Sequence, residues 1–127
     1  MSFSNYLEAA ILDHIFDEAS YTAPTWYVAL FVGDPGEAGA GGTEVSGNNY
    51  ARTALGATTR TDNSVVNDAA VEFPEASGSW GTIDYVALYD ASTAGNFLGS
   101  VAVDSPLAVG SGATARFAAG TLEFTLD

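Results

Sequence analysis

The chain has 127 residues, the usual size of one domain, and nearly half of them are apolar, which is enough for a hydrophobic core. It carries 16 acidic residues against three arginines, one histidine and no lysine, and its net charge is −13. Binding to nucleic acid or to an anionic membrane surface is therefore disfavoured, because both depend on clustered cations.

The N-terminal sequence MSFSNYLEAAILDHIF does not predict a signal peptide, because it lacks a basic n-region and acids interrupt its apolar positions. No apolar run approaches the roughly 20 residues that a membrane-spanning helix needs. The chain has no cysteine, which excludes disulfides, thiolate nucleophiles and cysteine zinc sites and fits a cytosolic stage.

Residues 4–18 are predicted to form one amphipathic helix. Ser4 can cap it, because a serine hydroxyl can accept a hydrogen bond from an otherwise unpaired backbone N–H. Large apolar residues recur at four-residue spacing and give the helix one apolar stripe, made by Leu7, Ile11 and Ile15. Acids near the C-terminal end are unfavourable for the helix dipole, so we expect them to serve solubility or a partner.

From residue 26 onward the apolar period changes to two, which indicates β-strands. The last segment alternates cleanly and places Leu122, Phe124 and Leu126 on one face. Turn-forming residues separate the strand candidates, which are 26–32, 50–55, 69–73, 83–89, 96–103, 113–118 and 121–126. This spacing predicts a mainly β fold with one N-terminal α-helix: an antiparallel β-sandwich or a jelly-roll-like open barrel of about seven or eight strands.

We expect a single domain over residues 1–127. Residues 1–20 would hold the N-terminal amphipathic helix, and residues 21–127 would form the β-sandwich. The longest connection in that sandwich is the loop 33–49.

One internal echo is visible, because YVALF at residues 27–31 recurs as YVALY at residues 85–89. Similar packing demands on two central strands explain it, whereas an ancient duplication would leave more matching positions. Both runs are almost continuously apolar, so both of their faces should be covered. We expect the facing sheet to cover one face, and the helix or a neighbouring subunit to cover the other.

The loop 33–49 is rich in glycine and lies within the stretch GDPGEAGAGGTEVSGNNYAR. Its glycine spacing is that of a phosphate-binding loop, but Gly42 stands where that motif needs lysine, and three nearby acids would repel a nucleotide. The same acids and loop carbonyls suit calcium, although the spacing matches no EF-hand. We therefore assign no cofactor and keep calcium in residues 33–44 as an outside alternative. The loop is expected to be long, exposed and in contact with another subunit.

Enzymatic chemistry is not indicated, and no catalytic residue is assigned. His14 is the only histidine, and no G-x-S-x-G elbow presents a serine to it. A single histidine also cannot build an ordinary zinc site. Carboxylate pairs for glycoside hydrolysis exist by chance among so many acids, for example Asp84 with Asp90, and nothing marks any pair as held in a cleft.

Aromatic residues and arginines are the other candidates for contacts. In a domain this small the following aromatic residues cannot all be central: Tyr21, Trp26, Tyr50, Trp80 and Tyr85. They serve either core packing or a contact surface for protein or glycan. Because arginines are so few, we expect each of Arg52, Arg60 and Arg116 to have a specific carboxylate partner, across a subunit boundary.

Several stretches carry a resemblance to a known family: SFSNYLEAAILDHIF, YTAPTWYVALFVGDPGEAGAGGTEVSGNNYAR, FPEASGSWGTIDYVALYDASTAGNFLGS and FAAGTLEFTLD. Nearly end to end, the chain resembles a family of short tailed-bacteriophage virion proteins that are often described as tail-fibre-like. The resemblance implies a β-rich structural piece on the outside of a phage particle, present in many copies. It implies no enzymatic activity.

Two functions follow as expectations from this resemblance. A compact domain without a fibrous shaft favours a capsid decoration or cement protein, which would bind the major capsid protein on the outer capsid surface. The alternative is a small tail-fibre or receptor-binding module that contacts a host glycan or a tail protein. In both cases we expect assembly in the host cytoplasm and a homo-oligomer, such as a trimer. The residues predicted to face partners are Tyr6, Leu7, Ile11, His14, Asp34, Glu37, Tyr50, Arg52 and Trp80.

Overall fold

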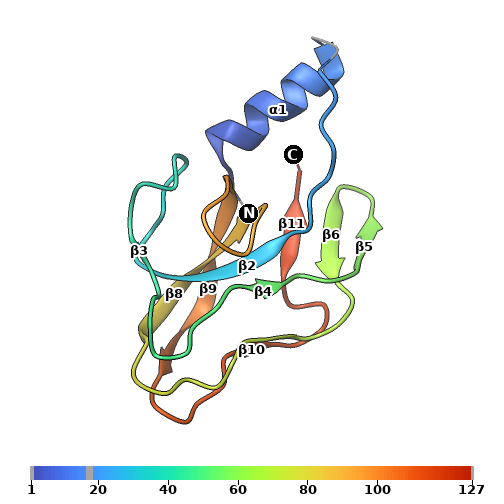
Figure 1. Ribbon diagram of the computed structural model, residues 1–127. Coiled ribbons are helices and arrows are strands. Elements are labelled where there is room, and N and C mark those ends of the chain that lie inside the picture. Colours follow the sequence, from blue (N-terminus) through green and yellow to red (C-terminus); the bar gives the residue numbers. More distant parts are fainter. Residues whose placement is uncertain (1, 17–18, 127) are drawn as a thin grey trace.

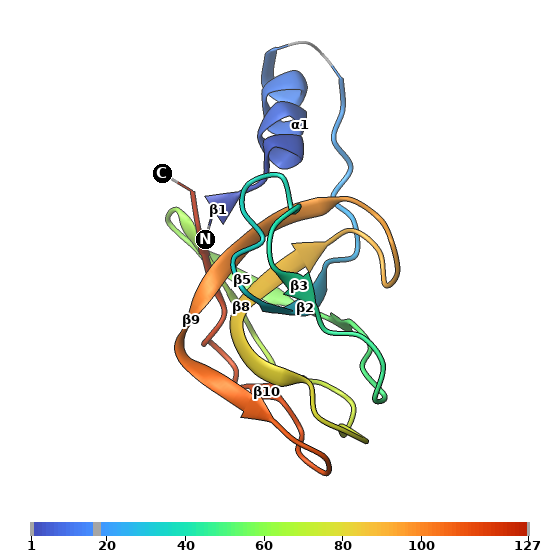
Figure 2. The same ribbon diagram turned by 90° about the vertical axis from the view of Figure 1, so that its left-hand side faces the viewer.

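The computed structural model describes residues 2–16 and 19–126 of the chain. The predicted fold class is confirmed: antiparallel sheets form a mainly β, sandwich-like fold, and one α-helix lies near the N-terminus. Figures 1 and 2 show the helix above the sheets and joined to them at its first turn. The described sheets do not close into a barrel.

The main sheet has the strand order β1-β9-β8-β2-β3, and β4 also pairs with β2. Its strands are β1 (Ser2–Phe3), β2 (Tyr27–Val32), β3 (Thr43–Glu44), β4 (Thr53–Ala54), β8 (Gly81–Tyr89) and β9 (Phe97–Val109). Two smaller sheets complete the fold, formed by β5 (Thr58–Thr61), β6 (Ser64–Asn67) and β11 (Glu123–Thr125), and by β7 (Val71–Glu72) and β10 (Arg116–Phe117).

The internal echo has a structural explanation, since its two runs are neighbours in the main sheet. Strands β2 and β8 pair antiparallel over the full length of these two runs. Ala29, the middle residue of the first run, lies opposite Ala87, the middle residue of the second. Val28 and Leu30 therefore lie in the main hydrophobic core, and Phe31 lies in a second cluster on the opposite face. Both faces are buried, as the apolar pattern predicts.

The second face, which we expected the helix or a neighbouring subunit to cover, is in part covered by the chain's own loop 33–49. A Cβ added at Gly39 would lie 2.7 Å from the Cγ of Phe97, so the loop backbone touches that ring. Gly39 also has a φ of 68°, which favours glycine. Most residues of the loop are exposed, as predicted, and the loop also contains β3 and the buried Val45; its contact with another subunit stays a prediction.

Two strand predictions differ from the structure. Strand β9 continues past residue 103 to Val109. Its register with β8 shifts on the way, because residues 103–106 of β9 lie opposite a single residue of β8, Asp84. Pro106 sits in this irregularity, because proline cannot donate to a sheet ladder. The hairpin of β5 and β6 was not expected, since its residues are mostly polar and do not alternate with apolar ones.

Helix α1 (Asn5–Phe16) begins where the sequence predicts. The Ser4 hydroxyl accepts a hydrogen bond from the backbone N–H of Leu7 at 3.2 Å and donates one to the carbonyl of Phe97 at 2.6 Å. The cap is thereby confirmed, and it also fastens the helix to β9. The predicted end at residue 18 lies outside the described residues.

Candidate functional site

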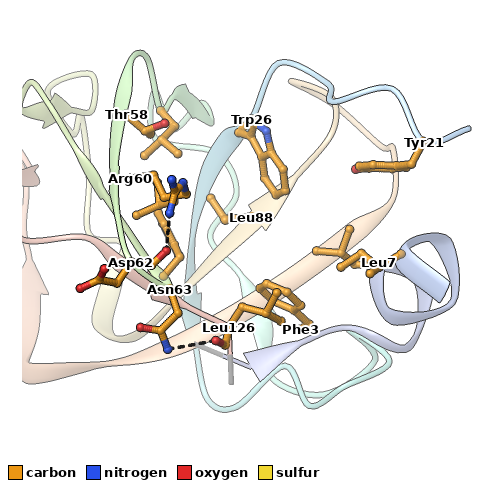
Figure 3. A pocket seen from close by; sticks show the side chains of 14 residues that line it. Phe3, Leu7, Tyr21, Trp26, Thr58, Arg60, Asp62, Asn63, Leu88 and Leu126 are labelled. Atoms are coloured by element: carbon orange, nitrogen blue, oxygen red, sulfur yellow. Dashed lines mark hydrogen bonds between the residues drawn. The ribbon is translucent and has the colours of Figure 1, made fainter. Parts of the chain in front are cut away.

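An apolar groove of about 600 Å³ opens between helix α1 and the small sheet of β5, β6 and β11 (Figure 3). We call this feature the groove. Its lining residues are Phe3, Leu7, Ile11, Tyr21, Trp26, Leu55, Thr58, Arg60, Asp62, Asn63, Val65, Leu88, Phe124 and Leu126. This volume lies in the range of sites that bury a ligand or a partner's side chains.

One wall of the groove is a row of side chains across the small sheet. Arg60 on β5 lies opposite Val65 on β6, and Val65 lies opposite Phe124 on β11. Residues directly opposite in antiparallel strands place their side chains on the same face, so this row faces the groove as a unit. The alternation predicted for residues 121–126 therefore supplies part of the wall.

The other wall comes from the main sheet and the segment that joins it to α1. Leu88 lies on β8, and Trp26 immediately precedes β2. The backbone N–H of Leu55 donates to the carbonyl of Trp26 at 2.8 Å, which fixes these two lining residues relative to each other. Leu7 and Ile11 line the end of the groove next to the helix.

Among the residues that line the groove, Tyr21 has a side-chain hydroxyl whose hydrogen bonding is incomplete. Its backbone N–H donates to the Nδ1 of His14 at 3.0 Å, which turns the chain back from the end of the helix. Its hydroxyl points into the groove (Figure 3), is buried, and has no hydrogen-bond partner among the described residues. Burial, followed by the phenol of Tyr6 and the charge of Asp90, raises the pKa of Tyr21, so the phenol stays protonated at neutral pH.

The open rim of the groove is polar, and two of its side chains form hydrogen bonds to backbone carbonyls. The guanidinium of Arg60 donates to the backbone carbonyl of Asp62 at 2.5 Å, and the amide of Asn63 donates to the carbonyl of Leu126 at 3.0 Å. Both bonds are drawn in Figure 3. Among the described residues Arg60 forms no ion pair, so the carboxylate partner expected for it is not found.

Arg52 does have the predicted carboxylate partner, but that partner lies in the same chain. Its guanidinium forms a two-pronged pair with Glu44 at 2.7 and 2.8 Å and donates to the carbonyls of Ala91 and Ala94. The guanidinium carbon also lies 3.5 Å from the centre of the Tyr89 ring. The expectation of a partner across a subunit boundary is therefore wrong for Arg52. Arg116 pairs loosely with Glu72 at 3.7 Å, again within the chain.

The residues predicted to face partners separate into three groups. Leu7 and Ile11 line the groove, and Tyr6 and His14 lie exposed on the helix beside it. Asp34 and Glu37 lie exposed on the loop 33–49 and do not line the groove. The remaining three, Tyr50, Arg52 and Trp80, are held inside the molecule. The interface role of all nine residues stays a prediction.

For Trp80 the structure selects core packing, one of the two roles left open for the aromatic residues. Its side chain is only 5% exposed, and its indole N–H donates to the carbonyl of Asn48 at 2.9 Å. The Tyr50 ring packs against it edge-on, with ring centres 5.4 Å apart. Trp80 thus fills the core. Beside Leu7 and Ile11, the groove is lined by residues that the sequence did not single out for contact, such as Phe3, Val65 and Phe124.

Three of the acids considered for catalysis or calcium accept hydrogen bonds from backbone N–H groups. Asp84 accepts a hydrogen bond from the N–H of Gly33 at 2.6 Å, and Asp90 accepts one from the N–H of Asn96 at 2.7 Å. Asp34 accepts one from the N–H of Gly36 at 2.8 Å. Within residues 2–16 and 19–126, no three His, Cys, Asp or Glu side chains are grouped as metal ligands. The absence of a cofactor stays a prediction, and calcium in residues 33–44 stays the outside alternative. No helix in the described part of the chain is long and apolar enough to cross a bilayer.

Comparison with known proteins gives one finding that bears on function. No curated protein matches the chain significantly in sequence. Residues 2–125 match the family model described as podophage GP4 fiber I protein gp80, and the chain therefore belongs to this family of tail-fibre-like structural proteins of the phage virion.

Proposed function

We propose that this chain is a non-enzymatic tail-fibre component of a phage particle, held in place by another virion protein through the groove. The match of residues 2–125 to a fibre protein family carries this proposal. It favours the fibre alternative over the capsid-cement function that the compact shape of the domain first indicated. The groove supports attachment to a partner, because it leaves a concave apolar surface uncovered in the single chain.

A protein fits the groove better than a host glycan does. Recognition of sugar hydroxyls depends on several free hydrogen-bonding groups, whereas most of the groove lining is apolar. Two of its polar side chains, those of Arg60 and Asn63, already bond to backbone carbonyls. Trp80, one of the aromatic residues considered for a glycan contact surface, is buried in the core.

The position of the protein on the virion tests this function. Antibody-labelled virions, or a reconstruction of the particle by electron cryomicroscopy, should show the chain on the tail and not on the head. Density on the outer capsid surface would overturn the fibre assignment and restore the cement function. Absence of the chain from purified particles would overturn a virion role altogether. Particles that lack the chain provide the control for label specificity.

A further inference from the structure

Helix α1 continues the apolar surface of the groove beyond the body of the molecule. Along its stripe, Leu7 is buried, Ile11 is half-buried at the edge of the groove, and Ile15 is 61% exposed. Leu12 and Phe16 are 56% and 74% exposed. On a helix, residues three and four positions apart are neighbours, so Ile15 adjoins Ile11 at the edge of the groove, and Leu12 adjoins both Ile15 and Phe16. We call Leu12, Ile15 and Phe16 the helix patch.

The charges around this combined surface are mostly negative. The acidic side chains of α1, Glu8 and Asp13, are both exposed, and Asp62 lines the far side of the groove. Asp90 is close enough to Tyr21 to raise the pKa of its phenol, although burial is the larger cause. The one cation in the lining, Arg60, donates a hydrogen bond to the backbone carbonyl of Asp62.

The unpartnered hydroxyl of Tyr21 indicates that the groove is incomplete in the single chain. A buried hydroxyl without a hydrogen bond costs free energy, so a partner that supplies one would be favoured. The phenol oxygen can accept a bond from a Lys or Arg N–H as well as donate one. Because the hydroxyl can do both, it does not select the sign of a partner's charge, and the preference for Lys or Arg rests on the surrounding acids.

We propose that the groove and the helix patch together bind an amphipathic segment of another virion protein, with apolar side chains on one face and Lys or Arg beside them. This inference rests on the proposed function and specifies the chemistry of the partner. A second copy of the chain is disfavoured as the occupant, because each copy carries a net charge of −13 and would bring the same acids together. Apolar segments docked as helices in grooves are a common mode of recognition.

Two synthetic peptides test the chemistry of the partner. Both are amphipathic helices of about five turns with leucine at the same positions; one carries lysine and the other glutamate on the polar face. Titrated against the full chain, the lysine peptide should bind and change the fluorescence of Trp26, and its affinity should fall about tenfold when salt screens the charges. The glutamate peptide should bind at least about tenfold more weakly. Equal binding of both peptides, or of neither, overturns the inference.

Matched variants locate the binding surface. The double change Ile15→Ser and Phe16→Ser should weaken the lysine peptide about tenfold or more, whereas Leu107→Ser, at an exposed apolar position on β9, should not. Circular dichroism checks that each variant folds, and these side chains are exposed, so folding should persist. If the patch variant and the control lose equal affinity for the lysine peptide, the peptide binds exposed apolar residues non-specifically, and the inference is overturned.

The charge requirement has its own matched pair of variants. Glu8→Gln with Asp13→Asn should weaken binding of the lysine peptide, whereas Asp68→Asn with Asp104→Asn removes equal charge from other exposed positions and should have a smaller effect. If the two double changes weaken binding of the lysine peptide equally, only the net charge of the chain matters, and the inference about this surface is overturned. Self-association of the chain that strengthens with salt and is lost on Phe16→Ser would show that a second copy covers the surface, which also overturns the inference.

Failure of this inference is distinguishable from failure of the proposed function. If the Ile15→Ser and Phe16→Ser protein still reaches the tail of the particle, the fibre role stands and the docking surface is wrong. If the unaltered chain is found on the head, the fibre role fails whatever the peptides do.

Discussion

Arg52 links three parts of the chain that are far apart in sequence. Its guanidinium joins Glu44 on β3 to the carbonyls of the 91–94 turn and rests on the Tyr89 ring of β8. The side chain is only 8% exposed, so the pair with Glu44 is shielded from water. Removing one partner of such a pair leaves the other charge without compensation, which is costly.

We therefore expect Arg52→Ala to lower the free energy of unfolding by about 3 kcal/mol, because the carboxylate of Glu44 loses its partner in a sheltered site. Urea denaturation followed by tryptophan fluorescence measures this change. Arg116→Ala is the matched control and should cost less than about 0.5 kcal/mol, since its pair with Glu72 is solvent-exposed. Similar losses in both variants would show that the Arg52 cluster contributes no more than a surface pair.

Helix α1 is attached to the rest of the fold chiefly at its N-terminal end. Ser4 bonds to the backbone of β9, the N–H of Asn5 donates to the carbonyl of Glu37 at 3.2 Å, and Leu7 is the helical residue that is buried. The C-terminal half of the helix therefore contributes little to folding. Its apolar residues are available for the partner that we propose.

This arrangement predicts unequal effects along one apolar stripe. Leu7→Ala should lower the free energy of unfolding by about 3 kcal/mol, because it empties a fully buried site. Ile15→Ala should change it by less than about 0.5 kcal/mol, since that side chain is exposed. Thermal or urea unfolding measures both. A loss at Ile15 as large as that at Leu7 would mean that the whole helix packs on the domain.

At the scale of the whole molecule, the net charge of −13 sets the response to salt. Repulsion among exposed carboxylates opposes the compact state, and salt screens it, because the Debye length falls from about 10 Å at 0.1 M to about 3 Å at 1 M. The pair between Arg52 and Glu44 is attractive but sheltered, so salt weakens it less. Repulsion therefore dominates the salt dependence.

We expect the urea midpoint to rise when sodium chloride increases from about 0.02 to 1 M, a gain in the free energy of unfolding of about 1 kcal/mol. A variant in which several exposed acids are changed to their amides should show a smaller gain, which identifies repulsion as the cause. A midpoint that stays constant or falls with salt would contradict this account.

Much of the architecture follows from local pattern. Alternation over residues 121–126 and the apolar runs at 27–31 and 85–89 predicted strands, and Ser4 predicted the start of the helix. The hairpin at β5 and β6 was missed because its strands lack apolar alternation and the two-residue loop between them, Asp62-Asn63, contains no glycine. Likewise, an apolar period cannot show that β9 continues through Pro106 with an irregular register.

By itself, the sequence determined the fold class and the capped helix, because these depend on neighbouring residues and on the period of the apolar positions. Only the tertiary structure decided that Trp80 is core, that Glu44 pairs with Arg52, and that residues as distant as Phe3 and Phe124 enclose one groove. Periodicity shows that a side chain is apolar. Which apolar side chains stay uncovered depends on how the sheets and helix pack, and that is a property of the whole chain.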